Sequence, residues 1–208
     1  MKAHTKETQS KMTPETSLEE LKNGNKRFVD RQNLNRDLMQ QVSETSNGQY
    51  PFATVLSCID SRVSSELIFD QGIGDIFSVR IAGNFVNEDI LGSMEFACKL
   101  AGTKLIVVLG HTACGAVKGA CDHARLGNLT ALINKIEPAV DAVNEPYDQS
   151  LRNSSNIEFV NRVAEKNVDM TISEIRSSSP VLNEMEKNGE IKIVGGMYDI
   201  SSGLVSFN

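Results

Sequence analysis

Apolar residues in this chain follow two patterns, short runs typical of buried strands and repeats at three- and four-residue spacing typical of amphipathic helices. Strand-like runs occupy 53–57, 76–81, 104–109 and 191–194. The run at 104–109 is continuous rather than alternating, which favours a strand buried on both faces of a parallel sheet. Residues 204–207 alternate, as expected for an antiparallel edge strand. The order strand, helix, strand predicts right-handed parallel crossovers.

Helical spacing predicts the elements between these strands. They fall at 17–28, 34–42, 64–69, 87–101, 114–124, 129–143, 160–175 and from Pro180 to about 187, with a polar loop at 145–156. Ser17 with Glu20 has the pattern of a capping box at the start of the first helix. We therefore expect an α/β fold with a mostly parallel central sheet flanked by helices. The N-terminal helices are expected to pack on a partner subunit, with packing on their own domain as the alternative.

Composition narrows the class of protein. The chain has 208 residues, 40% of them hydrophobic and 23% charged, as in an ordinary globular protein. We expect a flexible tail at 1–14 followed by a single domain at 15–208. The formal net charge of −6 gives no reason to expect nucleic acid or an anionic membrane as a partner. Residues 1–14 lack the apolar core of a secretory signal, so a cytoplasmic location is expected.

Two polar stretches follow two of the predicted strands directly. Cys58 comes after 53–57, and His111 and Cys114 come after 104–109. The carboxyl ends of parallel strands meet at one edge of a sheet, where ligands bind. Cysteine and histidine are ligands that Zn²⁺ prefers, so these three residues are a candidate metal site. The residues alone leave open the alternative that the cysteines are merely small buried apolar groups.

The other cysteines and histidines are poorer candidates for that site. Cys121 lies seven residues after Cys114 on the same predicted helix, about 10 Å away at ~1.5 Å per residue. Cys98 and Cys121 are therefore expected to pack in the core, and His123 is expected on a helix surface. Asp60 and Arg62 lie on the same side as Cys58 if the chain there is extended. An arginine–carboxylate pair at this place would keep the carboxylate ionised. The alternative is an ion pair at the surface, which contributes little to stability.

The motifs Cys58–Arg62, Val79–Asn84, Gly110–Gly115 and Ile193–Asp199, in this order, resemble the β-class carbonic anhydrases from about Leu18 to the end. The resemblance implies one zinc ion per chain, held by Cys58, His111 and Cys114. It implies water or hydroxide at the fourth position in an open form, and Asp60 there in a closed form. Pairing of Asp60 with Arg62 keeps the site open.

The resemblance also implies residues that bind substrate. Gln49 matches a glutamine that reaches the site from the neighbouring subunit, which makes a homodimer the minimal unit and a homotetramer the alternative. Phe77, Ala82 and Phe96 match an apolar pocket for carbon dioxide. Gly115 matches the backbone amide that donates to bicarbonate.

Two positions depart from patterns seen in the family. Phe96 stands where other members have tyrosine, so a hydroxyl contact is missing. Val55 stands where members that bicarbonate switches off have tryptophan, which argues against that form of regulation.

The implied function is zinc-dependent, reversible hydration of carbon dioxide to bicarbonate and a proton, by a zinc-bound hydroxide that Asp60 orients. One alternative is hydrolysis of a sulfur analogue, carbonyl sulfide or carbon disulfide, on the same scaffold. A second alternative is a catalytically silent protein with a structural zinc ion, whose coordination shell would be closed.

Overall fold

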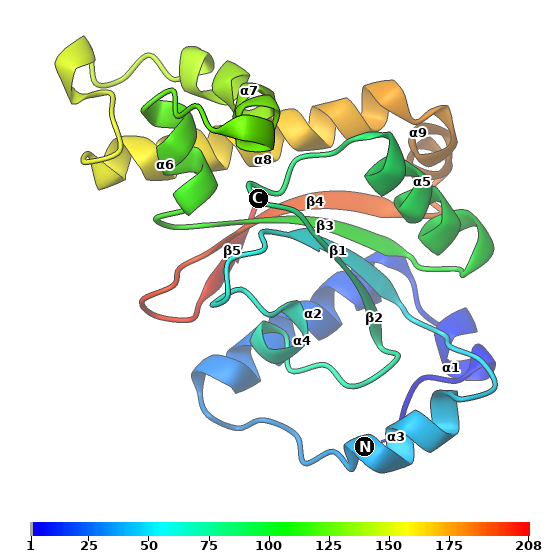
Figure 1. Cartoon of the computed structure of the whole chain (residues 1–208). Helices are drawn as coiled ribbons and strands as arrows, with labels where there is room; N and C mark the ends of the chain where they lie inside the picture. Colours follow the sequence, from blue (N-terminus) through cyan, green and yellow to red (C-terminus); the bar gives the residue numbers. More distant parts are fainter. Residues whose placement is uncertain (1) are drawn as a thin grey trace.

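A five-stranded sheet runs through the middle of the computed structural model, which describes residues 2–208 (Figure 1). The strand order is β2-β1-β3-β4-β5. The first four strands are parallel, and β5 pairs antiparallel with β4. The strands are β1 (Ala53–Ser57), β2 (Ile76–Arg80), β3 (Leu105–His111), β4 (Lys192–Tyr198) and β5 (Val205–Phe207). This arrangement confirms the α/β fold, the mostly parallel sheet and the antiparallel edge strand.

Helices that follow β2 in the sequence cover one face of the sheet (Figure 1). They are α5 (Glu88–Glu95), the π-helical turn η1 (Phe96–Leu100), α6 (Gly115–Cys121), α7 (Gly127–Ala142), α8 (Ile157–Ser178) and α9 (Pro180–Lys187). A short 3₁₀ turn, η2 (Gln149–Leu151), lies in the polar loop before α8. The apolar stripe of α8, including Val163, Val168 and Ile175, is buried in the larger of two hydrophobic clusters. Burial of that stripe holds α8 against β3 and β4.

The N-terminal helices and α4 lie on the opposite face (Figure 1). They are α1 (Lys6–Ser10), α2 (Pro14–Val29), α3 (Leu38–Thr45) and α4 (Ser65–Ile68). Leu21 of α2 is fully buried in the second cluster, with Phe52 and Phe69. Helix α2 therefore packs on its own domain. Helix α3 leaves Leu38, Met39 and Val42 exposed. Packing of the N-terminal helices on a partner subunit stays a prediction.

The first long helix begins earlier than the sequence pattern predicted. Thr13 is its N-cap, and the capping box joins Thr13 to Thr16 rather than Ser17 to Glu20. Pro14 fits the first helical turn because it has no N–H to leave unpaired. Ser17 is instead buried inside α2, so the predicted capping box was wrong.

The segment expected to be a flexible tail carries the short helix α1. Gln9 in this helix is buried, and its side-chain amide donates to the carbonyls of Pro51 and Ala101. These two hydrogen bonds place α1 against the start of β1 and the end of η1. The polar composition that suggested a tail gave no sign of a buried amide.

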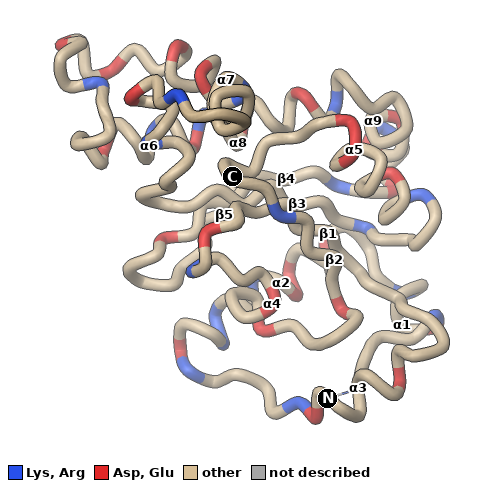
Figure 2. The backbone as a smooth tube through the Cα atoms, in the orientation of Figure 1, with Lys and Arg blue, Asp and Glu red and all other residues tan. Residues whose placement is uncertain are grey.

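Strand order decides what meets at the edge of the sheet. Strands β1 and β3 are neighbours, because β2 lies on the outer side of β1. The carboxyl ends of β1 and β3 thus open onto one place. No helix in residues 2–208 combines the length and the apolar character needed to cross a membrane. Figure 2 shows acidic and basic residues interspersed over both helical layers.

Candidate metal centre

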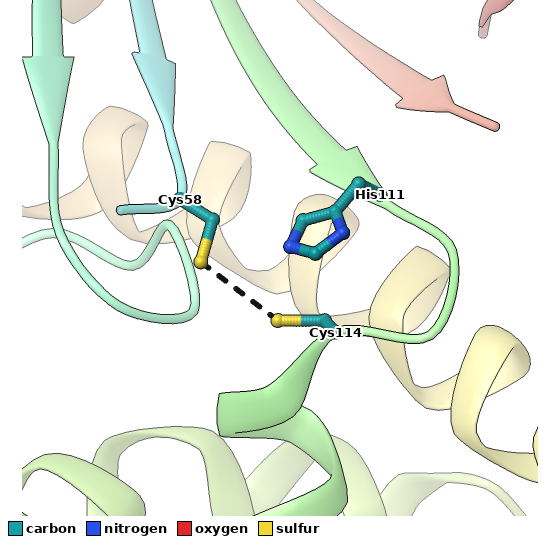
Figure 3. A group of neighbouring side chains, drawn as sticks. All are labelled: Cys58, His111 and Cys114. Carbon is teal, nitrogen blue, oxygen red and sulfur yellow. Dashed lines mark hydrogen bonds between the residues drawn. The ribbon is translucent and has the colours of Figure 1, made fainter. Parts of the chain in front are cut away.

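Three side chains from separate parts of the chain meet at the carboxyl edge of the sheet (Figure 3). Cys58 follows the last residue of β1, His111 is the last residue of β3, and Cys114 is the N-cap of α6. One ligand atom from each residue lies within 4.8 Å of the others, and all three side chains are buried. The sequence prediction that these residues converge is therefore confirmed.

The imidazole of His111 has one nitrogen with a partner and one without. Nδ1 lies 3.0 Å from the carbonyl oxygen of Thr112, to which it donates. This bond fixes the tautomer and leaves Nε2 as an acceptor. Nε2 is buried and has no hydrogen-bond partner among the described residues. A buried acceptor beside two sulfur atoms suits a cation, and this donor set suits Zn²⁺ in particular.

The two thiols share a hydrogen bond, with Sγ of Cys58 and Sγ of Cys114 3.9 Å apart. That bond, together with His111 and the amide of Gly83, lowers the pKa of Cys58 to about 4. The pKa of Cys114 is raised, because its hydrogen bond to Cys58, burial and the nearby negative charge all favour the neutral thiol. The thiolate of Cys58 therefore forms easily, and its negative charge disfavours ionisation of the Cys114 thiol. A divalent cation between the sulfur atoms would remove that effect.

Asp60 and Arg62 form a bidentate ion pair beside the cluster. Arg62 donates from Nε to Oδ1 at 2.9 Å and from Nη2 to Oδ2 at 2.7 Å. Hydrogen bonds from Arg62 hold the pKa of Asp60 well below its usual range. Oδ2 also lies 4.0 Å from Nε2 of His111, so the carboxylate borders the three ligands.

The backbone around this pair is a turn rather than the extended chain that the sequence argument assumed. Oδ1 of Asp60 accepts from the backbone N–H of Arg62, and the carbonyl of Asp60 accepts from the N–H of Val63. Asparagine and aspartate commonly form such turns through their side chains. The ion pair is confirmed, but its local geometry comes from this turn.

Arg80 and Gly83 support the loop that carries Cys58. Arg80 donates to the carbonyls of Cys58 and Asp60, and the N–H of Gly83 lies 3.4 Å from Sγ of Cys58. The sequence analysis cited both residues only as part of a motif and assigned them no contact. The contact of Arg80 with the Cys58 loop becomes predictable only once the strand register is known, because Arg80 pairs with Ser57 at the end of β1.

The loop between His111 and Cys114 is held from two sides. The N–H of Thr112 donates to the carbonyl of Tyr198, and the hydroxyl of Thr112 accepts from the N–H of Ile200. On the other side, the N–H of Ala113 donates to Oδ1 of Asn161 at 2.9 Å. The sequence analysis missed Asn161, which lies on the amphipathic helix α8 outside any motif.

Two of the predicted substrate-binding residues lie beside the cluster. Ala82 immediately precedes Gly83, whose amide contacts Cys58. Gly115 immediately follows Cys114 and opens α6, with its backbone exposed and open space where a side chain would be.

The other three lie away from the cluster of their own chain. Phe77 pairs with Thr54 in the sheet, four residues before Cys58, or about 13 Å at ~3.3 Å per residue. Phe77 and Phe96 contact each other edge to face, with ring centroids 6.3 Å apart. Together they line a groove of about 740 Å³ between β2 and α5. Gln49 is exposed and lies before the amino end of β1, opposite the cluster.

The remaining cysteines are buried, as the sequence analysis expected, whereas His123 lies at the surface but past the end of α6 rather than on a helix. Cys98 and Cys121 are buried in the larger hydrophobic cluster. Burial raises the pKa of each thiol to about 11, so neither ionises readily. His123 is exposed beyond the end of α6 and contacts Glu137.

Known proteins have sequences similar to this chain. Residues 53–205 match the family model described as carbonic anhydrase. The chain is 33% identical over 196 residues to carbonic anhydrase 2 of Mycobacterium tuberculosis, which covers 91% of this chain and 90% of the relative.

Solved structures agree with the sequence comparison. The β-carbonic anhydrase CafA of Aspergillus fumigatus is 26% identical with a TM-score of 0.71, covering 93% of this chain and 89% of that one. One of two tetrameric β-carbonic anhydrases from Sordaria macrospora is 25% identical with a TM-score of 0.68, covering 79% and 84%.

Proposed function

Because this chain belongs to the β-carbonic anhydrase family, we propose that Cys58, His111 and Cys114 hold one zinc ion and that the protein hydrates carbon dioxide reversibly to bicarbonate and a proton. One observation carries the proposal. A buried imidazole nitrogen that has no hydrogen-bond partner in residues 2–208 lies beside two thiols and next to a carboxylate held by arginine. The thiols and the imidazole supply the ligands, and the carboxylate supplies an acceptor at the edge of the site.

Zinc, when bound, is the Lewis acid that makes water a nucleophile near neutral pH. The rest of the chemistry belongs to the side chains. Asp60 stays ionised beside Arg62, so Oδ2 can accept a hydrogen bond from the attacking oxygen and direct its lone pair at carbon dioxide. Arg62 holds Asp60 by two parallel hydrogen bonds and so keeps the carboxylate from becoming a fourth ligand.

Substrate contacts in this proposal come from two chains. Gly115 offers a backbone amide at the start of α6 to an oxygen of bicarbonate. Ala82 supplies apolar surface beside Cys58. Gln49, Phe77 and Phe96 lie too far from the cluster of their own chain, so they would act in the cluster of a second copy. A homodimer is then the minimal unit, and a tetramer is the alternative that the similar Sordaria macrospora proteins illustrate.

A cytoplasmic location belongs to the same proposal. Two thiols that must stay unoxidised to bind metal suit a reducing compartment. The exposed backbone at Gly115 and the position of Asp60 at the edge of the cluster also suggest that small solutes can reach the candidate metal centre.

The two alternatives predict different behaviour. A silent structural zinc ion would need Asp60 as its fourth ligand, but Asp60 is engaged twice by Arg62. Hydrolysis of carbonyl sulfide or carbon disulfide would use the same residues. Nothing in the groove lined by Phe77 and Phe96 favours sulfur over oxygen.

A stopped-flow assay decides among these functions. Chain fully loaded with zinc is mixed with carbon dioxide, and acidification is followed with a pH indicator. We expect a rate far above the buffer blank, abolished in Cys114→Ser and kept in the matched variant Cys121→Ser. A rate equal to the blank would contradict the proposal. Faster release of sulfide from carbonyl sulfide than hydration of carbon dioxide would favour the sulfur analogue.

A further inference from the structure

One of the two residues between the candidate ligands His111 and Cys114 has an unusual backbone. Ala113 has a φ of +54°, in the left-handed region that residues with a Cβ rarely adopt. Glycine adopts this region freely, but the chain has alanine here. The conformation therefore depends on contacts from outside the loop.

One such contact comes from a distant helix. Asn161, in the second turn of α8, accepts the N–H of Ala113 at 2.9 Å through Oδ1. Thr112, on the other side of Ala113, is fixed separately to Tyr198 and Ile200 near the end of β4. Asn161 is thus the side chain that holds the half of the loop next to Cys114.

We infer that Asn161 is a positioning residue for the metal ligand Cys114. Its hydrogen bond is to the backbone of Ala113 rather than to a candidate ligand atom. It acts by keeping Ala113 left-handed, which sets the direction in which the next residue, Cys114, presents its sulfur to Cys58 and His111. The inference rests on the proposed function, because it assumes that the three residues hold a metal ion.

The test measures metal binding rather than turnover. Affinity for Co²⁺ and Zn²⁺ is measured by competition with a chelator, and the visible spectrum of bound Co²⁺ reports its ligand geometry. We expect Asn161→Leu to weaken binding by about tenfold or more, the range seen when groups that orient metal ligands are removed. Asn161→Asp keeps an acceptor oxygen and should retain most of the affinity and the cobalt spectrum.

A second substitution distinguishes this role from general stability. Glycine at position 113 adopts a positive φ without help, so Ala113→Gly should restore much of the affinity lost in Asn161→Leu. The matched control is Asn156→Ala at the N-cap of the same helix, which removes the acceptor of the Phe159 N–H. It should lower the melting temperature and leave metal affinity unchanged.

The outcomes separate the two hypotheses. Wild-type chain that takes up no cobalt overturns the proposed function and this inference with it. If wild type binds cobalt and Asn161→Leu binds it equally well, only the inference is overturned. Should Asn161→Leu fail to fold by circular dichroism, Asn161→Gln takes its place, because its amide is displaced by one methylene. Equal affinity in Asn161→Gln and Asn161→Asp then overturns the inference.

Discussion

Two carboxylates ten residues apart, Asp60 and Asp70, are both paired with arginine, yet their surroundings differ. Asp60 is 16% exposed and pairs with Arg62, which is 51% exposed. Asp70 is 4% exposed and pairs with Arg36, which is 6% exposed, and with Arg27. The first pair borders the candidate metal centre, and the second lies where α2, α4 and the segment before α3 meet.

The number of partners explains what each carboxylate can do. Both oxygens of Asp70 accept from arginine at 2.6 Å, and Oδ2 also accepts from the N–H of Leu34. Asp70 is thus fully engaged in joining three segments. The carboxylate of Asp60 pairs with one arginine of the described chain, Arg62, and one of its oxygens faces His111. The same pair of chemical groups therefore stabilises the fold in one place and leaves a usable acceptor in the other.

The largest effect is expected from Asp70→Asn, which should lower the free energy of unfolding by about 3 kcal/mol. The variant leaves the nearly buried guanidinium of Arg36 without its counter-ion, while Arg27 keeps its pairing with Glu20. Urea unfolding followed by circular dichroism measures the loss. The matched control is Asp30→Asn in the exposed pair with Lys26, for which a change below about 0.5 kcal/mol is expected. Equal losses in both variants would make the two kinds of pair indistinguishable.

Asp60→Asn should have the opposite profile. We expect kcat/KM for hydration to fall about a hundredfold, close to 2.7 kcal/mol, because the attacking oxygen loses its ionised acceptor. Zinc content and the free energy of unfolding should stay near those of the wild type. Stopped-flow hydration with metal analysis on the same sample checks this. Unchanged turnover would refute the orienting role of Asp60.

Acid should remove the contribution of Asp70 to the free energy of unfolding. Burial raises the pKa of this carboxyl, but hydrogen bonds from Arg27, Arg36 and the Leu34 N–H outweigh burial and leave the pKa lowered. The stabilisation is therefore complete above the unfolded value of about 3.9 and is lost as pH falls below it. Unfolding of wild type and Asp70→Asn, compared at pH 7 and pH 3.5, should show a smaller difference at pH 3.5. A constant difference contradicts the assignment.

The smallest effect is expected from Arg62→Lys. An ammonium group cannot form two parallel hydrogen bonds to Asp60, so the carboxylate should be held less firmly. We expect hydration to slow about fivefold, with little change in stability because Arg62 is exposed. Stopped-flow hydration at saturating zinc measures it. A rate equal to wild type would show that a single charge is enough.

The strands and the ligands of the candidate site could be predicted from the sequence, because both follow from local patterns. A continuous apolar run such as that ending at Leu109 indicates a buried strand by itself. Cys58 and His111 each follow such a run, and the geometry of parallel sheets then brings them together. The start of α2 was misplaced because Ser17 with Glu20 fits the capping-box pattern, whereas Thr13 is marked only by the proline that follows it.

The contacts that support the site could not be predicted in the same way. Asn161 contacts Ala113 across 48 positions, and Arg80 contacts Cys58 across 22. Each contact depends on how whole elements pack, and a single polar residue on a helix or strand carries no mark of that packing. The turn at Asp60 was missed because an ion pair two residues apart fits both an extended chain and a turn.

The adjacency of β1 and β3 has a consequence for biosynthesis. The candidate ligands come from the ends of both strands, Cys58 from β1 and His111 and Cys114 from β3 and the loop after it. A nascent chain therefore has no complete metal-binding set until Cys114 has left the ribosome and β3 has docked beside β1. Capture of a cation would then follow the pairing of β1 with β3. Metal occupancy would separate correctly assembled molecules from those whose central strands had paired in the wrong order.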